Sequence, residues 1–131
     1  MSVHIPEQAL SLLDKTEFAT VATVLPNGQP HLSVMWVARD GDDVLLSSVV
    51  GRQKHLNLVA NPRASVLIFP KDNPYTYVEI RGHVTLTESG GRDLIDRLNK
   101  KYTGGDRFEA DDDTDNVRVV IRLTPDKIFS R

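Results

Sequence analysis

Turn signals divide the first half of the chain into short extended segments, and this division restricts the possible folds more than any other feature. Pro26-Asn27-Gly28 and Asp40-Gly41-Asp42 are typical of tight turns between strands. The segments around them, residues 18–25, 30–38 and 44–49, are rich in Val, Thr, Leu and Ala. Three such segments joined by tight turns predict an antiparallel meander.

Three more segments are expected to be strands, at residues 64–69, 75–87 and 117–123. The longest of them, 75–87, contains Gly82 in its middle. A glycine at that position predicts a β-bulge or sharp coil, which a small barrel needs in order to close. Residues 127–131 are expected to form a tail after the closing strand.

Three short helices complete the expected architecture. Pro6 falls in the first turn of a helix expected to cover one end of the core, and Ser89 can N-cap a helix running to about Tyr102. A third helix is expected at residues 52–60, where an apolar stripe spaced to face the core is formed by Leu56, Val59 and Ala60. Six strands and three helices predict a mainly β, antiparallel barrel in one domain, residues 1–131.

The composition excludes several classes of function. The chain has 131 residues, a formal net charge of −2 and no cysteine, which rules out disulfides, thiol nucleophiles and thiolate metal sites. The near-neutral charge gives no basic field for nucleic acid. No apolar run reaches the roughly 18 to 20 residues needed to span a bilayer, and the N-terminus shows no secretory leader. We therefore expect a cytoplasmic protein with neither nucleic acid nor membrane as a partner.

The start of the helix at residues 52–60 is unusual in its charge. Helix first turns favour acidic residues, because the N-terminal end carries positive charge and unpaired N–H groups. Here Arg52 and Lys54 occupy that turn, and the hydroxyls of Ser47 and Ser48 lie just upstream. These donors could form a phosphate cradle, or the helix could simply expose its cations to solvent. The stretch alone leaves the two interpretations evenly balanced.

Motifs for nucleophilic or metal-dependent catalysis are absent. Nucleotide-binding glycine loops, G-x-S-x-G and H-E-x-x-H are all missing. The four histidines show no metal-ligand spacing, so no metal site is expected, and the aspartates at 111–113 are expected to form a solvated loop. His31 and His83 could donate protons in a cleft, but no partner is evident for either. If the chain is an enzyme, a cofactor must supply the reactivity.

Three stretches resemble a known family: FATVATVLPNGQPHLSVMWV, LLSSVVGRQKHLNLVANPRASVLI and YTYVEIRGHVTLTE. They resemble the split β-barrel flavin and deazaflavin proteins related to pyridoxamine 5'-phosphate oxidase, and more narrowly the branch that uses coenzyme F420. The resemblance covers most of residues 10–90. It implies a six-stranded antiparallel Greek-key barrel of the FMN-binding split-barrel type, a homodimer, and a cofactor site at the subunit interface.

The resemblance also assigns roles to individual residues. Arg52 and Lys54 would bind the cofactor phosphate with help from Ser47 and Ser48, which favours the cradle over the solvated helix. The cofactor ring would lie along the strand that contains Leu32, Ser33, Val34, Met35 and Trp36, while the other subunit would contribute Tyr75, Thr76 and Tyr77. Simple barrel or dimer packing is an equally good account of Trp36 and Tyr77.

The second strand supplies only Arg39 where phosphate oxidases usually carry an Arg and a Lys, and no C-terminal Arg-Pro-Trp segment is seen. Both features favour F420 over FMN. We therefore expect an F420-dependent oxidoreductase that transfers hydride to a small unsaturated or conjugated substrate, with Tyr77 and His83 as candidate proton donors. The alternatives are an FMN-binding oxidoreductase of the same fold and a non-catalytic carrier of flavin, haem or tetrapyrrole.

Overall fold

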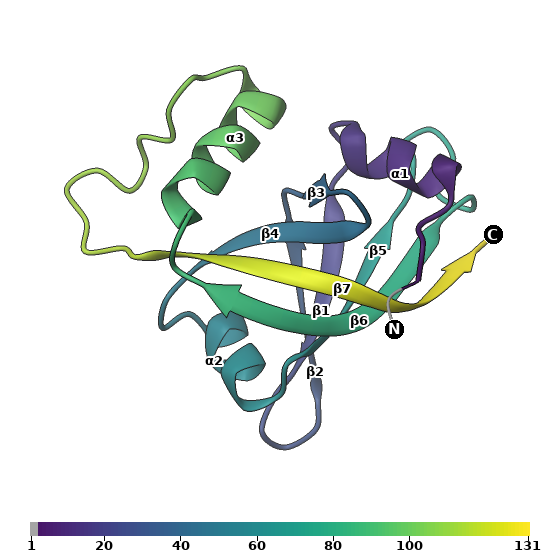
Figure 1. The fold of residues 1–131 in the computed structure, drawn as a ribbon, viewed down its shortest axis with the longest axis horizontal. Coiled ribbons are helices and arrows are strands. Elements are labelled where there is room, and N and C mark those ends of the chain that lie inside the picture. Colours follow the sequence, from purple (N-terminus) through teal and green to yellow (C-terminus); the bar gives the residue numbers. More distant parts are fainter. Residues whose placement is uncertain (1–2) are drawn as a thin grey trace.

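The described part of the chain forms a single antiparallel β-sheet of seven strands with three helices attached, arranged as in Figure 1. The computed structural model describes residues 3–131. The strands follow the spatial order β2-β1-β5-β6-β7-β4-β3. In chain order the elements are α1 (Glu7–Asp14), β1 (Ala19–Val24), β2 (Pro30–Met35), β3 (Ala38–Asp40), β4 (Asp43–Val49), α2 (Gln53–Ala60), β5 (Arg63–Ile68), β6 (Val78–Thr87), α3 (Gly91–Thr103) and β7 (Arg118–Ser130). The expected mainly β antiparallel architecture with three short helices is confirmed.

The expected count of six strands is wrong, because the segment 30–38 breaks into two strands. β2 ends at Met35 and pairs with β1, whereas β3 begins at Ala38 and pairs with β4. At the break, side chains of α3 take the place of a neighbouring strand. The Val37 N–H donates to the hydroxyl of Tyr102 (3.1 Å), and the Val37 carbonyl accepts from the ammonium of Lys101. Partners more than 60 residues away therefore satisfy the backbone where the strand is interrupted.

β7 is longer than expected and lies between β6 and β4. Residues 127–130 belong to this strand, so the prediction of a tail there is wrong. The predicted irregularity at Gly82 is confirmed, since the β6–β7 register shifts between Arg81 and Gly82. A Cβ at Gly82 would overlap the carbonyl oxygen of Thr124 on β7. Only glycine lets the two strands approach this closely.

Two hydrophobic clusters hold the sheet and helices together. The larger fills the barrel and includes Ala9, Leu12 and Leu13 of α1, which covers one end as expected. The smaller lies under α3, where Leu94 and Leu98 pack on residues of β3, β4 and β7. α3 begins after Gly90 at the N-cap position, in place of the expected Ser89. No helix within residues 3–131 is long and apolar enough to cross a membrane.

The face that α2 buries differs from the expected one. Leu56 and Val59 are 51% and 62% exposed, and Ala60 is exposed as well, while Asn57 and Leu58 are buried. The Asn57 amide donates to the Thr23 hydroxyl on β1 (3.0 Å) and accepts from Gln53 (2.7 Å). These hydrogen bonds offset the cost of burying a polar group and fix the helix against the barrel.

Candidate functional site

A cavity of about 380 Å³ opens between the start of α2 and the inner side of α3. It brings together half of the residues predicted to bind a cofactor: Val34, Met35, Trp36, Ser47, Arg52 and Lys54. Five residues that the sequence did not single out for the site also line it: Phe18, Ile95, Leu98, Phe108 and Arg118. The cavity therefore has one cationic end and one mostly apolar, aromatic side.

Three cations converge at the cationic end. Arg52 is the N-cap residue of α2, Lys54 lies in its first turn, and Arg118 begins β7. Burial lowers the pKa of Lys54, and the charges of Arg52 and Arg118 lower it further. Within residues 3–131 neither Arg52 nor Lys54 forms an ion pair with a carboxylate, and no side chain caps the N-terminus of α2. Such an excess of positive charge fits a bound anionic group.

The two predicted serines point in opposite directions, because successive side chains of a strand alternate between its faces. Ser47 lines the cavity, and its hydroxyl oxygen lies 3.5 Å from Nη1 of Arg118. Ser48 is 1% exposed and faces the interior, where its hydroxyl has no hydrogen-bond partner among the described residues. The cavity thus gains one hydroxyl from this pair.

The aromatic side of the cavity is a stacked cluster. Tyr102 lies between Phe18 and Trp36, with ring centroids 5.7 Å and 5.4 Å away, and the ring of Phe108 meets Trp36 edge-on at 6.2 Å. The Tyr102 hydroxyl donates to the carbonyl of Glu17 (2.6 Å), and burial raises its pKa. Trp36 therefore both packs against α3 and lines the cavity. A planar apolar ligand could lie beside this cluster.

The other predicted residues lie outside the cavity in a single chain. Leu32 is 65% exposed on β2, and Tyr75 is 75% exposed in the loop before β6. Ser33 lies on β2 and Tyr77 just before β6, while Thr76 lines a different cavity beside α1. His83 lies on β6 and pairs with Asp126 on β7. Residues 75–77 are expected to act from a second subunit, so their role stays a prediction.

The partner of His83 was not evident from the sequence. Asp126 lies near it because the register of β6 and β7 shifts between Arg81 and Gly82, which leaves Asp126 as the unpaired residue of β7 at the bulge; the His83 Nδ1 to Asp126 Oδ1 distance is 3.1 Å. Both side chains are about half exposed. His31, the other candidate proton donor, lies on β2 and its Nδ1 has no hydrogen-bond partner among the described residues.

Arg118 is the residue of greatest chemical interest that the sequence did not reveal. It opens the closing strand, more than 60 residues after Arg52 and Lys54, and its partner comes from the acidic loop. The expectation that this whole loop is solvated is wrong at Asp111, whose side chain is only 7% exposed. Hydrogen bonding to Arg118 lowers the pKa of Asp111 to about 2.

Comparison with known proteins places this chain in a family. The sequence matches the family model of pyridoxamine 5'-phosphate oxidase over residues 5–131. The solved structure of an F420 reductase superposes with a TM-score of 0.85 at 33% identity, over 97% of this chain and 100% of that chain. A conserved hypothetical protein of Mycobacterium tuberculosis matches with a TM-score of 0.75 at 26% identity, over 97% and 84% of the two chains.

General stress protein 26 of Bacillus anthracis shares the fold, with a TM-score of 0.70 at 18% identity over 94% of this chain and 90% of that chain. No curated protein matches the sequence. Because the family model spans nearly the whole chain, the protein belongs to the pyridoxamine 5'-phosphate oxidase family of split β-barrel proteins.

Proposed function

We propose that this protein is a coenzyme F420-dependent oxidoreductase that reduces a small unsaturated or conjugated substrate. The observation that carries the proposal is the group of cations at the start of α2, two of which have no carboxylate partner among the described residues. Support also comes from the 33% identity to an F420 reductase over nearly the full length of both chains. When bound, the reduced cofactor supplies the hydride. The protein's task is to bind and orient the cofactor and the substrate and to exclude water from them.

Each part of the site has a physical task in this proposal. Arg52 and Lys54 hold the phosphate group through charge-assisted hydrogen bonds, and the Ser47 hydroxyl assists them. Residues 32–35 of β2, with Trp36 directly after them, lie along the cofactor ring, and the stacked Trp36 and Tyr102 keep water from its apolar side. Ser48 faces the interior, so its hydroxyl is not directed toward the phosphate.

A homodimer would complete the site. Leu32 and Val34 are 65% and 69% exposed on β2, which is an edge strand of the sheet. Two large apolar side chains on a strand edge favour a protein partner. In the dimer, Tyr75, Thr76 and Tyr77 of the second subunit reach the cofactor, and Tyr77 or His83 supplies the proton. A single domain and a cytoplasmic location stay predictions.

An FMN-binding oxidoreductase of the same fold is the second candidate. It is favoured by the third cation, Arg118, because three converging positive charges suit a phosphate monoester with nearly two negative charges. F420 instead carries a phosphodiester with a single negative charge at this position. The Arg118 guanidinium is already partly neutralised by Asp111, which keeps the net charge of the pocket compatible with either group.

Fluorescence titration of the purified protein with oxidised F420 and, separately, with FMN tests the proposal. We expect micromolar or tighter binding of F420 and weaker binding of FMN. The reverse preference would assign the protein to the FMN candidate, and binding of neither would refute both. Binding of F420 without oxidation of the reduced cofactor by any acceptor would instead identify a non-catalytic carrier.

A further inference from the structure

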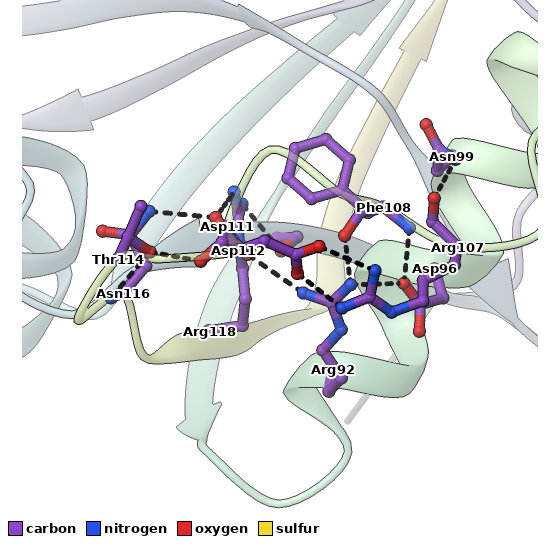
Figure 2. A network of polar contacts seen from close by, with 11 residues as sticks. Arg92, Asp96, Asn99, Arg107, Phe108, Asp111, Asp112, Thr114, Asn116 and Arg118 are labelled. Carbon is purple, nitrogen blue, oxygen red and sulfur yellow. Dashed lines mark hydrogen bonds and ion pairs between the residues drawn. The ribbon is translucent and has the colours of Figure 1, made fainter.

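The loop between α3 and β7, residues 104–117, is fastened to the barrel by a network of ion pairs (Figure 2). Its central residue is Asp111. The carboxylate accepts from Nε and Nη2 of Arg118 at 2.7 and 2.9 Å, and from the Asn116 amide at 2.9 Å. The side chains of Asp111 and Arg118 are 7% and 9% exposed. This pair is therefore a desolvated, two-pronged contact, unlike the solvent-screened pairs elsewhere on the surface.

The same contact fixes the direction of the Arg118 guanidinium. Two of its three nitrogens point to Asp111, and the third, Nη1, lies on the cavity side, 3.5 Å from Ser47 Oγ. A guanidinium is rigid and planar, so occupying one edge determines where the remaining donors point. Those donors face the end of the cavity that Arg52 and Lys54 share.

The loop also builds part of the cavity wall through Phe108. The Phe108 N–H donates to Asp96 Oδ1 at 2.8 Å, and its carbonyl accepts from Arg92, both on α3 (Figure 2). Its ring packs against the Arg118 guanidinium at 4.9 Å and against Trp36. Arg118 is thus held from one side by Asp111 and from another by an aromatic ring that the loop positions.

We propose that Arg118 is a third cationic ligand of the anionic group in this pocket, and that Asp111 is a positioning residue that presents it. This inference rests on the proposed function of the pocket and adds a ligand that lies outside the α2 start. Its ligand class is a phosphate-type oxyanion, which accepts a hydrogen bond from Nη1 of Arg118 beside the Ser47 hydroxyl.

The proposal predicts an effect of opposite sign to simple electrostatics. Asp111→Asn removes a negative charge near the pocket, so Coulomb attraction alone would tighten anion binding. If Asp111 positions Arg118, the same substitution releases the guanidinium and weakens anion binding. Asp112→Asn is the matched control: it removes one carboxylate from the same loop, but Asp112 is 43% exposed and pairs with Arg107 on the solvent side.

The experiment compares two ligands that differ only in the phosphate, FMN and riboflavin, by fluorescence titration. For a protein that prefers F420, the pair is the deazariboflavin core of F420 and the 5'-phosphate of that core, which again differ only in the phosphate. We expect Arg118→Gln to weaken binding of the phosphorylated ligand by about ten-fold or more, and Asp111→Asn to weaken it in the same direction. Neither of these two substitutions should change binding of the phosphate-free ligand. Asp112→Asn should leave the binding of both ligands unchanged.

A double-mutant cycle tests whether Asp111 acts through Arg118. Asp111→Asn should have no further effect in the Arg118→Gln background. Arg118→Lys keeps the charge but loses the two-pronged contact with Asp111, so it should also weaken binding of the phosphorylated ligand. This variant tests the same geometry if Asp111→Asn does not fold. Emission of Trp36, the only tryptophan of the chain, reports whether Phe108 stays in place.

Tighter or unchanged FMN binding in Asp111→Asn, or an equal loss for both ligands, would overturn the positioning role. Unchanged binding in Arg118→Gln would overturn the ligand role. Arg52→Gln separates these failures from failure of the proposed function: if it weakens the phosphorylated ligand while the Arg118 variants do not, only this inference is wrong. If neither substitution matters, the pocket does not bind the phosphate.

Discussion

We expect Lys54 to lower the stability of the free protein and to increase its affinity for the cofactor. The substitution Lys54→Met separates these two effects. The ammonium is half-buried beside Arg52 and Arg118, and its pKa is lowered by burial and then by those charges. Methionine keeps the length of the side chain and removes the charge. We therefore expect the substitution to stabilise the free protein while it impairs cofactor binding.

The two effects differ in size. Solvent screens the repulsion among partly exposed cations, so the unfolding free energy of the free protein should rise by no more than about 1 kcal/mol. A charge-assisted hydrogen bond to phosphate contributes about 1.5–3 kcal/mol, so cofactor affinity should fall by about ten-fold or more. The gain in stability should shrink at high salt, because screening weakens the repulsion in wild type.

Urea unfolding of the free protein and fluorescence titration with F420 or FMN measure the two quantities. Lys15→Met is the control: Lys15 is exposed at the end of α1 and forms no ion pair within residues 3–131. It should change neither quantity. The lowered pKa of Lys54 means that wild type gains stability as pH rises from the folded pKa to the ordinary value of 10.5, and the advantage of Lys54→Met should disappear there.

Two results would refute this reasoning. Loss of stability in the Lys54→Met free protein would show that the ammonium has a stabilising partner. Unchanged affinity for both cofactors would show that Lys54 does not contact the anion.

Three other substitutions test the fold, the loop and the assembly. Gly82→Ala should lower the unfolding free energy in urea by about 3 kcal/mol or more, because the new methyl group overlaps the carbonyl of Thr124. A loss below about 1 kcal/mol would show that β6 and β7 can separate at this position. Pairing with Arg118 lowers the pKa of Asp111 from 3.8 to about 2, so the carboxylate stabilises the fold fully above pH 3.8 and loses that effect as pH falls through 2. Thermal melts from pH 2 to 5 should therefore show that wild type loses about 2 kcal/mol more stability on acidification than Asp111→Asn does. The same pH profile in both proteins would contradict the pairing with Arg118. Leu32→Lys should convert the expected dimer into monomers in light scattering, whereas a wild-type protein that is already monomeric would contradict the proposed interface.

Features set by neighbouring residues were predictable from the sequence. Alternation along residues 78–87 agrees with the observed burial, and Gly82 marks the correct bulge. The cationic start of α2 was also visible, because Arg52 and Lys54 lie within three positions of each other. Each of these signals depends only on a local conformational preference.

Features set by distant partners were not predictable. The break at Val37 depends on Tyr102 and Lys101, which approach only after α3 has packed. The face of α2 was predicted wrongly because the buried residue is Asn57, a polar side chain whose burial becomes favourable only beside Thr23. Arg118 was missed for the same reason, since its place beside Lys54 follows from the pairing of β4 with β7.

The position of β7 in the sheet has a consequence for synthesis on the ribosome. β7 is the last of the seven strands to be made, yet it lies between β6 and β4. Until residues 118–130 emerge, β6 and β4 both lack the strand that joins them, so the edges that β7 covers in the complete sheet stay unpaired. Exposed edges recruit other chains, so this interval is the time of greatest aggregation risk. A stall or a deletion within β7 should therefore yield insoluble protein, even though α2 and its cations are already complete.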